Sequence, residues 1–410
     1  MIDNVAIVSI GDELINGFTV DTNSSWIAQK ICQYRAISIK SKLTISDNKN
    51  EIVDKLDHLL NQNYRFIFIT GGLGPTHDDI TKDALKKYFD CDLVLNDNHF
   101  LYLKNKYNHH VSADLNLIKE QSKILTLSQP IPNKEGVALG MMIEHKNTMI
   151  FVMPGVPLEM KHMFNDYIIP NYIEEYYQFQ PKYITLLTTG IYESALYKML
   201  QNTIYSNKKE FTVSFLPSYT GVKIRLGLAD ISASLTSFKK QVMLNIGDYV
   251  YGYNNDKIES IVSDILINKS LTLSIAESCT GGYLSKRITD IPNSSKFFIG
   301  SIVSYSNEIK NKYLDISNQV LEDKGAVSGE VALLMAQNIR KKFDTDIGIS
   351  TTGISGPSGG TKDKPVGRIY IAIVFRGHEI VKEFDLLPKR DKHREIAAHT
   401  AFNMLRLLIK

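Results

Sequence analysis

Three loops in the last third of the chain carry residues that could do chemistry. Residues 276–282 read AESCTGG, residues 304–310 read SYSNEIK, and residues 351–360 read TTGISGPSGG. The first loop offers a serine that can act as a nucleophile and glycines that allow close approach to the backbone. The second carries a phenol and an ammonium group, and the third sets hydroxyls among glycines, which suits phosphate and ribose oxygens. Together they indicate a nucleophile beside a phosphate-binding loop.

Each loop also has an ordinary explanation when it is taken alone. The first could simply begin a helix, because serine and threonine are preferred at that position. Tyr305 could be a half-buried aromatic and Lys310 a solvated helix residue, while the third loop lacks the GxxxxGK[ST] and GxGxxG spacings. However, each loop follows a predicted strand, and parallel strands gather their carboxyl ends at one edge of a sheet. The combination therefore favours a site.

The elements that position these loops belong to the last of three predicted domains. There we expect strands over 271–276, 297–304, 347–352, 368–375 and 379–385, and helices over 257–268, 281–290, 328–342 and 391–409. At the front of the chain we expect strands over 5–10, 37–44, 66–70 and 148–153, and helices over 23–34, 50–60, 79–89 and 157–168. Such alternation predicts βαβ units around mostly parallel sheets.

A small α+β module separates the two α/β regions. Residues 171–180 lack periodicity and precede Pro181, which indicates a boundary. The module then reads as strands over 183–189, 212–216 and 222–228 with helices over 193–201 and 234–244. We therefore predict an α/β fold class with domains over 1–170, 171–253 and 254–410, in which two parallel-sheet-rich domains flank the module.

The composition excludes several classes of protein. With 43% hydrophobic and 22% charged residues among 410, the chain can build large cores and is not disordered. Its 47 basic and 44 acidic residues give a net charge of +3, which does not support a dedicated nucleic-acid binder. Three cysteines without a CxxC pair fit a reducing cytoplasm. The apolar run at 5–10 is too short for a signal peptide or membrane span, so we expect a soluble, cytoplasmic protein.

The C-terminal motifs resemble those of the CinA (competence/damage-inducible) family. Besides AESCTGG, they are YSN at 305–307, GAVS at 325–328, GISGP at 353–357 and PVG at 365–367. The resemblance covers about residues 255–410. It implies a nicotinamide-nucleotide amidohydrolase, which converts nicotinamide mononucleotide and water to nicotinate mononucleotide and ammonia without a cofactor. It also implies that Ser278, Tyr305 and Lys310 are catalytic.

An amide is a poor electrophile, so the site must activate a nucleophile, hold an oxyanion and protonate the leaving nitrogen. We expect Ser278 to attack the carboxamide while a Tyr305–Lys310 pair relays its proton, which requires Lys310 to be desolvated or close to Tyr305. Cys279 would have to displace serine in this scheme, and we do not assign it. The expected substrate-binding residues are Thr280, Gly281 and Gly282 for the oxyanion, and Gly353, Ser355, Gly356, Gly359, Gly360 and Arg368 for the phosphate.

The front of the chain resembles the N-terminal CinA domain, which is related in fold to molybdopterin-binding proteins. The matching motifs over residues 1–170 are GDEL at 11–14, DTNS at 21–24, TGGLGPT at 70–76, DDIT at 78–81 and MPGVP at 153–157. The resemblance implies an ADP-ribose pyrophosphatase that depends on a divalent metal, cobalt or magnesium, and on potassium. The expected phosphate-binding residues are Gly71, Gly72, Gly74 and Thr76, and the expected metal ligands are Asp12, Asp47, Asp78 and Asp79.

Alternatives remain open for this front domain and for the whole protein. Asp78 or Asp79 could only cap the helix that begins there, and the domain could be a non-catalytic nucleotide- or pterin-binding module. The middle module shows no GxxG loop or basic stripe, so we interpret it as a spacer or dimer element. We expect a homodimer that acts on small-molecule nucleotides in pyridine nucleotide salvage. The family name leaves an interaction protein of DNA uptake or recombination as the competing function.

Overall fold

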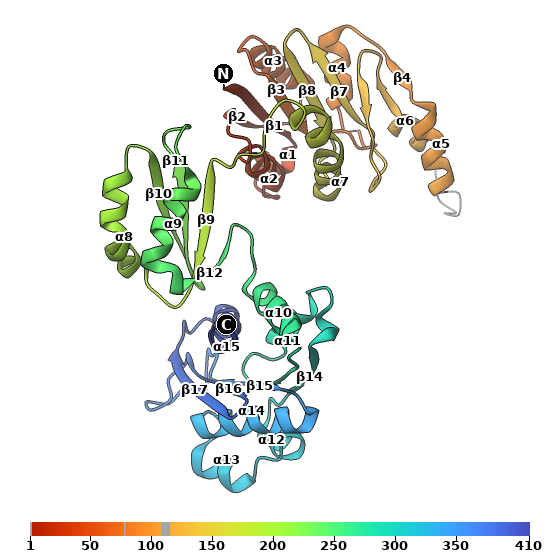
Figure 1. The fold of residues 1–410 in the computed structure, drawn as a ribbon. Helices are drawn as coiled ribbons and strands as arrows, with labels where there is room; N and C mark the ends of the chain where they lie inside the picture. Colours follow the sequence, from red (N-terminus) through yellow and green to blue (C-terminus); the bar gives the residue numbers. More distant parts are fainter. Residues whose placement is uncertain (1, 78, 108–114) are drawn as a thin grey trace. The chain divides into compact units, whose positions relative to one another are not determined.

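The computed structural model describes residues 2–77, 79–107 and 115–410. They belong to two units, Met1–Tyr183 and Ile184–Lys410, whose elements are drawn in Figure 1. The first unit is built on one large sheet, and the second unit contains two separate sheets. The mixed α/β fold class predicted from the alternating segments is confirmed.

A six-stranded sheet organises the first unit, in the order β2-β1-β3-β8-β7-β6. Its first four strands run parallel, whereas β7 and β6 are antiparallel additions at one edge. A separate ribbon pairs β4 with β5. The strands are β1 (Asp3–Ile10), β2 (Ile37–Ile45), β3 (Phe66–Thr70), β4 (Leu93–Leu95), β5 (Lys123–Leu125), β6 (Gln129–Ile131), β7 (Gly140–His145) and β8 (Thr148–Met153).

Helices cover both faces of this sheet because alternate residues of its strands point to opposite sides. Ala6 and Val8 of β1 pack in a core with α3 and α4, while Val5 and Ile7 pack in another core with α2 and α7. The helices are α1 (Asp12–Ile15), α2 (Thr22–Ile31), α3 (Lys49–Leu60), α4 (Thr81–Phe89), α5 (Asp97–Lys106), α6 (Leu115–Gln121) and α7 (Pro157–Met163).

A π-helical segment, Phe164–Ile173, continues α7 with Pro170 inside it. The helix therefore runs past residue 168, where the sequence predicted its end, and includes part of the stretch expected to be a boundary. Its wide turns place hydrogen-bond acceptors five residues back, as in the bond from the Glu174 amide to the Ile169 carbonyl at 2.8 Å. Ile168 and Ile173 are buried in the core below the sheet, which explains why the helix persists.

The second unit begins with a four-stranded sheet in the order β10-β11-β9-β12. Two helices, α8 and α9, share its core. These elements cover the residues for which the sequence predicted a small α+β module, and they lie in one unit with the five-stranded sheet described below. Its elements are β9 (Tyr183–Thr188), α8 (Glu193–Asn207), β10 (Phe211–Ser218), β11 (Gly221–Leu228), α9 (Leu235–Ile246), a short 3₁₀ turn (Gly247–Tyr249) and β12 (Val250–Tyr253).

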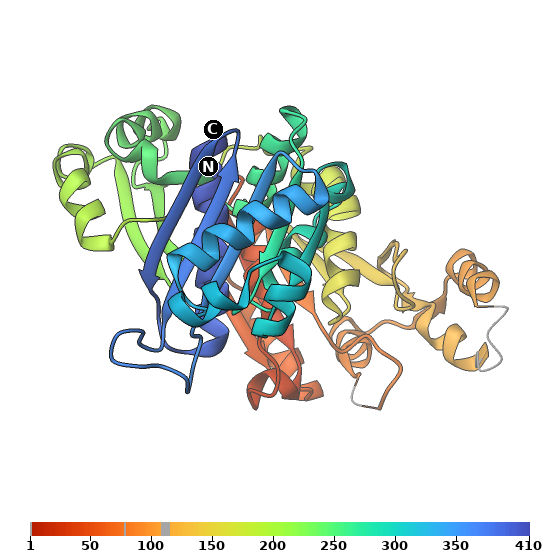
Figure 2. The ribbon, with the colours of Figure 1, turned by 90° about the horizontal axis from the view of Figure 1, so that it is seen from below.

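A five-stranded sheet, in the order β14-β13-β15-β16-β17, carries the three loops of interest. Strands β14, β13 and β15 are parallel, and β16 and β17 are antiparallel. Helices α10, α11 and α15 share a core on one face, and α14 packs on the other, as Figures 1 and 2 show.

The bounds of this part follow the predicted alternation. Its strands are β13 (Leu273–Glu277), β14 (Phe298–Val303), β15 (Ile347–Gly353), β16 (Arg368–Phe375) and β17 (His378–Asp385). Its helices are α10 (Ile258–Asn268), α11 (Tyr283–Thr289), a 3₁₀ turn (Ser294–Lys296), α12 (Asn307–Leu314), α13 (Asn318–Lys324), α14 (Gly329–Phe343) and α15 (Arg390–Ile409).

Candidate active site

Ser278 and Lys310 meet at the carboxyl edge of the five-stranded sheet. Ser278 follows the last residue of β13, and its amide donates to the Thr351 carbonyl of β15 at 2.9 Å. Lys310 lies on α12, and its Nζ donates to Ser278 Oγ at 3.0 Å and to the Ser304 carbonyl at 2.7 Å. The lysine is only 1% exposed. A hydroxyl and an amine from two separate loops therefore form one buried pair.

Burial shifts the pKa of Lys310 and also that of Cys279, the residue beside Ser278. Desolvation lowers the pKa of Lys310 to about 8, so a useful fraction is the neutral amine near neutral pH. Desolvation raises the pKa of the neighbouring Cys279 thiol to about 12, and the thiol packs in the hydrophobic core. Ser278 thus has a base within hydrogen-bond distance, whereas Cys279 stays a protonated core residue.

Two glycines shape the backbone after the serine. Gly281 and Gly282 have φ angles of +57° and +87°, a left-handed conformation that other residues adopt at a cost. The Gly281 amide donates to the Ser278 carbonyl at 3.1 Å, so the turn itself uses that donor. Of the three amides expected to hold an oxyanion, those of Thr280 and Gly282 are the better candidates.

Tyr305 occupies a different position from the one expected. Its hydroxyl accepts a hydrogen bond from Arg390 at 2.7 Å, and its side chain is 59% exposed. Within the described part of the chain it makes no hydrogen bond to Lys310, so the expected Tyr305–Lys310 relay is not assembled. The reason is local, because Ser304 and Tyr305 follow an extended strand and point to opposite sides. Ser304 is fully buried and its neighbour lies at the surface.

The first turn of α15 ties the glycine loops together, which the sequence analysis missed. The Arg394 Nε donates to the Thr280 carbonyl at 2.8 Å, and an Arg390 nitrogen donates to the Gly356 carbonyl at 3.0 Å. His393 is fully buried, and its Nδ1 lies 2.9 Å from Ser355 Oγ. Positions i, i+3 and i+4 share one helix face, so this spacing was the signal available in the sequence.

Arg368 does not fit the phosphate-binding role expected for it. It stands on β16 and forms ion pairs with Glu383 at 2.6 Å and Asp385 at 2.5 Å on the neighbouring strand. Because Arg368 and Asp385 are register partners across this antiparallel pair, the cation is already neutralised. Arg390, which contacts the third loop, is the better-placed cation.

The third loop keeps the backbone geometry expected of a ligand cradle. Gly356 and Gly359 have φ angles of +78° and +93°, and a Cβ on Gly360 would lie 2.7 Å from the Val366 nitrogen. Gly353 ends β15, where a Cβ would lie 2.6 Å from the Arg368 carbonyl. Larger residues at these positions would displace the loop.

The predicted glycine residues of the first unit line a cleft at the carboxyl edge of its sheet. Gly71, Gly72 and Gly74 lie along it, together with buried Gln121 and half-buried Glu159. Its volume is about 350 Å³, which lies in the range of small-ligand pockets. Burial raises the pKa of Glu159, although its hydrogen bond from Asn133 opposes the shift.

Among the described residues, the expected metal ligands Asp12, Asp47 and Asp79 bind nearby backbone amides. Asp79 accepts hydrogen bonds from the amides of Gly74 at 2.8 Å and Thr76 at 2.9 Å, and also from the Thr76 hydroxyl. Asp12 and Asp47 bind each other's amides through their carboxylates, at 2.9 and 3.2 Å. Asp78 lies outside the described residues.

Among the residues that are described, no group of three or more His, Cys, Asp or Glu side chains could hold a metal ion. Asp79 organises the glycine loop, and a metal site that includes Asp78 stays a prediction.

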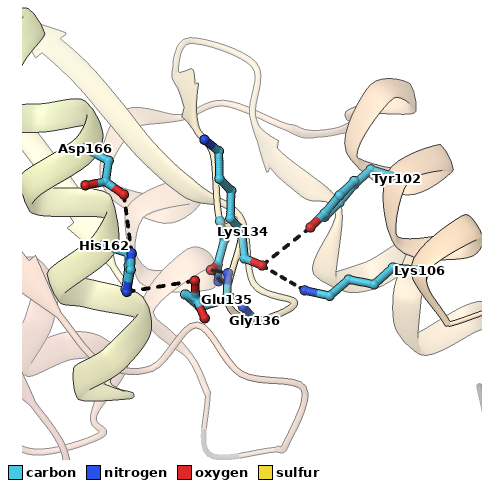
Figure 3. A network of polar contacts seen from close by, with 8 residues as sticks. Tyr102, Lys106, Lys134, Glu135, Gly136, His162 and Asp166 are labelled. Atoms are coloured by element: carbon cyan, nitrogen blue, oxygen red, sulfur yellow. Dashed lines mark hydrogen bonds and ion pairs between the residues drawn. The ribbon is translucent and has the colours of Figure 1, made fainter. Parts of the chain in front are cut away.

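A turn over residues 133–136 lies between α5 and α7 and is held by polar contacts on both sides (Figure 3). The Lys134 carbonyl accepts from Lys106 Nζ at 2.8 Å, and His162 lies 3.8 Å from Glu135. A Cβ on Gly136 would lie 2.0 Å from the Glu159 carboxyl carbon, so a larger residue there would displace the Glu159 side chain. The network thus fixes the turn that keeps Glu159 at the cleft.

Comparison with known proteins identifies the family. The family model of the CinA C-terminal domain matches residues 255–409. The family model of a probable molybdopterin binding domain matches residues 6–173. A CinA-like protein from Cytophaga hutchinsonii is 34% identical over 412 residues, covering 98% of this chain and 97% of the relative. The chain belongs to the CinA family. The resemblance inferred from the motifs is therefore confirmed.

Two further proteins are similar to this chain. A putative competence-damage inducible protein from Caldicellulosiruptor saccharolyticus is 34% identical over 408 residues, with 98% of each chain covered. A crystal structure of a CinA superfamily protein from Escherichia coli matches 38% of this chain and 92% of its own, with 32% identity and a TM-score of 0.36. In the described part of this CinA chain, every helix is too short or too polar to cross a membrane.

Proposed function

We propose that the second unit hydrolyses the carboxamide of nicotinamide mononucleotide to nicotinate mononucleotide and ammonia. The observation that carries the proposal is the buried Lys310 Nζ, 3.0 Å from Ser278 Oγ. A lysine whose pKa is lowered to about 8 by burial can remove a serine proton without help from histidine or metal. Membership of the CinA family is compatible with this chemistry.

In the first half-reaction, neutral Lys310 accepts the Ser278 hydroxyl proton while Oγ bonds to the carboxamide carbon. The carbonyl becomes an oxyanion that the amides of Thr280 and Gly282 stabilise. When the oxyanion collapses, the C–N bond breaks and Lys310 gives its proton to the departing nitrogen, which leaves as ammonia. The product is an ester between the nicotinate mononucleotide and Ser278.

Water completes the cycle through the same groups. Lys310 accepts a proton from water as the water oxygen attacks the ester carbon, and it returns that proton to Ser278 Oγ as the ester bond breaks. Arg390, beside Tyr305 and the Gly356 carbonyl, would hold the substrate phosphate with the glycine loop. Tyr305 then contributes through Arg390 at the mouth of the pocket.

The decisive test replaces the nucleophile. Ser278→Ala should lower the rate of ammonia release at least about 10³-fold while leaving the melting temperature unchanged. Cys279→Ala is the matched control, because it alters the adjacent residue and should keep most of the activity. Full activity in Ser278→Ala would refute the assignment, and loss only in Cys279→Ala would transfer it to the thiol.

For the first unit we propose a nucleotide pyrophosphatase that acts on ADP-ribose. The glycine-lined cleft at the strand ends supports it, since backbone amides of this kind bind phosphates. The test is to measure AMP release from ADP-ribose by the Ser278→Ala variant, with and without added cobalt or magnesium. Release of AMP would support the proposal. Binding without AMP release would instead indicate a nucleotide- or pterin-binding module. Salt-sensitive retention of DNA would favour the interaction protein of DNA uptake.

A further inference from the structure

A small recess adjoins the cleft of the first unit, and two residues of its lining, Ser9 and Asn23, have no role in the sites described above. It is lined by Ser9, Asn23 and Thr70, among others, and shares Glu13 and Gly155 with the glycine-lined cleft. Ser9 stands on β1 opposite Thr70 of β3 in the parallel register, and Asn23 lies in the first turn of α2. Two strands and a helix thus bring three polar side chains to one place.

The orientation of the Asn23 amide follows from its partners. Its nitrogen donates to Thr70 Oγ1 at 3.1 Å and to the Gly155 carbonyl at 2.7 Å. The Thr70 hydroxyl gives its own proton to the Pro154 carbonyl at 2.9 Å, so both partners of Asn23 can only accept. The nitrogen must therefore face them, and Asn23 Oδ1 is left buried without a partner among the residues that the structure describes.

Ser9 presents a second unmet group to the same recess. Its side chain is fully buried, and within residues 2–77, 79–107 and 115–410 its hydroxyl also has no hydrogen-bond partner. Folded proteins rarely bury such groups unpaired, because each lost hydrogen bond to water is a free-energy penalty. The third buried atom without a hydrogen-bond partner among the described residues is Oε1 of Gln121, a residue that lines the adjoining cleft. The first unit thus concentrates unmet hydrogen-bonding capacity at one edge of its sheet.

The chemistry of these atoms defines what they can bind. Asn23 Oδ1 only accepts hydrogen bonds, and the Glu13 carboxylate beside it is also an acceptor, so the recess favours a donor-rich group and disfavours an anion. The neighbouring glycine loop has the opposite preference, since backbone amides bind phosphate. A sugar phosphate satisfies both, with hydroxyls in the recess and phosphate at the loop.

We propose that Ser9 and Asn23 bind the ribose hydroxyls of a ribonucleoside 5′-phosphate, and so make the first unit selective for ribose over deoxyribose. This inference rests on the proposal that the first unit takes nucleotides. The hydroxyls of the ligand donate to Asn23 Oδ1 and exchange a hydrogen bond with Ser9 Oγ. Two buried groups that are unsatisfied in the free protein thereby gain partners.

The binding experiment compares AMP with 2′,3′-dideoxy-AMP by calorimetry on the full chain. The single tryptophan, Trp26, lies on α2 three residues after Asn23, so a change in its fluorescence assigns the binding to the first unit. Wild type should bind the dideoxy analogue about tenfold more weakly. Ser9→Ala should bind AMP about five- to tenfold more weakly, with unchanged affinity for the analogue.

Thermal stability separates a ligand-binding role from a structural one. Ser9→Ala removes an unpaired buried hydroxyl, so its melting temperature should stay equal or rise by a few degrees. Thr148→Val is the matched control, because the Thr148 hydroxyl is buried and donates to the Tyr64 carbonyl at 2.6 Å. That variant should melt lower and bind AMP normally.

Two outcomes overturn the inference. Equal affinity of wild type for AMP and its dideoxy analogue would remove the recess as the ribose site. A lower melting temperature in Ser9→Ala with unchanged AMP affinity would make the serine structural. If wild type still releases AMP from ADP-ribose in either case, only this inference fails, whereas absence of any nucleotide binding would remove the proposed function of the first unit as well.

Discussion

The two candidate sites of this protein differ in how many of their buried polar groups already have hydrogen-bond partners. In the second unit, Lys310 is held by Ser278 and a carbonyl, and the surrounding loops are tied to α15. In the first unit, three buried side-chain atoms at the cleft and its recess lack partners. A site that performs chemistry with its own groups must be assembled in advance, whereas a site that recognises a ligand can leave its hydrogen bonds to that ligand.

The largest effect is expected when the buried amine of Lys310 is removed. Lys310→Met keeps the shape and removes the base, so ammonia release should fall at least about 10³-fold. Folding should become more favourable at neutral pH by about 2 kcal/mol, because a charge no longer has to be desolvated. Chemical denaturation measures this change. A less stable variant would mean that Lys310 holds the fold rather than serving the reaction.

The pH dependence of the amidase should report the same lysine. Its folded pKa of about 8 lies below the usual value of 10.5, and the base must be neutral to act. The value of kcat/KM should therefore rise about tenfold per pH unit below pH 8 and level off above it. Stability should rise between about pH 8 and 10.5, where the unfolded chain binds the extra proton. Lys310→Met should lose this stability increment, and a flat rate profile in wild type would contradict the assignment.

A smaller effect is expected at Tyr305. Because its exposed hydroxyl reaches the site only through Arg390, Tyr305→Phe should raise KM about tenfold and leave kcat almost unchanged. Steady-state kinetics with nicotinamide mononucleotide provide the measurement. A large fall in kcat would show instead that the phenol joins Lys310 during turnover, as the sequence first suggested.

The smallest effect on the amidase is expected from the carboxylate of the glycine loop in the first unit. Asp79→Asn weakens hydrogen bonds from Gly74 and Thr76, at a cost of about 1–2 kcal/mol to that unit. Nucleotide binding followed by Trp26 fluorescence should weaken, while ammonia release stays the same. A parallel loss of amidase activity would show that the two clefts are coupled.

The sequence predicted the alternating elements well because their apolar runs are long enough to show a period. Residues 90–145 escaped prediction, since strands such as Leu93–Leu95 and Gln129–Ile131 span only three residues. The end of the helix after α7 was placed too early because Pro170 is tolerated within a wide turn. In both cases tertiary packing outweighs the local signal.

For the site, the sequence predicted that Ser278 and Lys310 lie close together, because each residue follows one of two adjacent parallel strands. It failed for Arg368, whose partners depend on the register of β16 and β17. It also failed for Arg390 and Arg394, which lie about a hundred residues from the serine in sequence. Contacts set by distant helices leave little trace in local spacing.

The opening turn of α15 has a consequence for heat inactivation. Arg390 and His393 contact the third loop, and Arg394 contacts the turn after Ser278. Fraying of a single helix end would therefore release both segments at once. Amide exchange in the serine turn and in the glycine cradle should thus share one opening rate with α15. Catalysis would then be lost on warming as a cooperative local event, before the rest of the molecule melts.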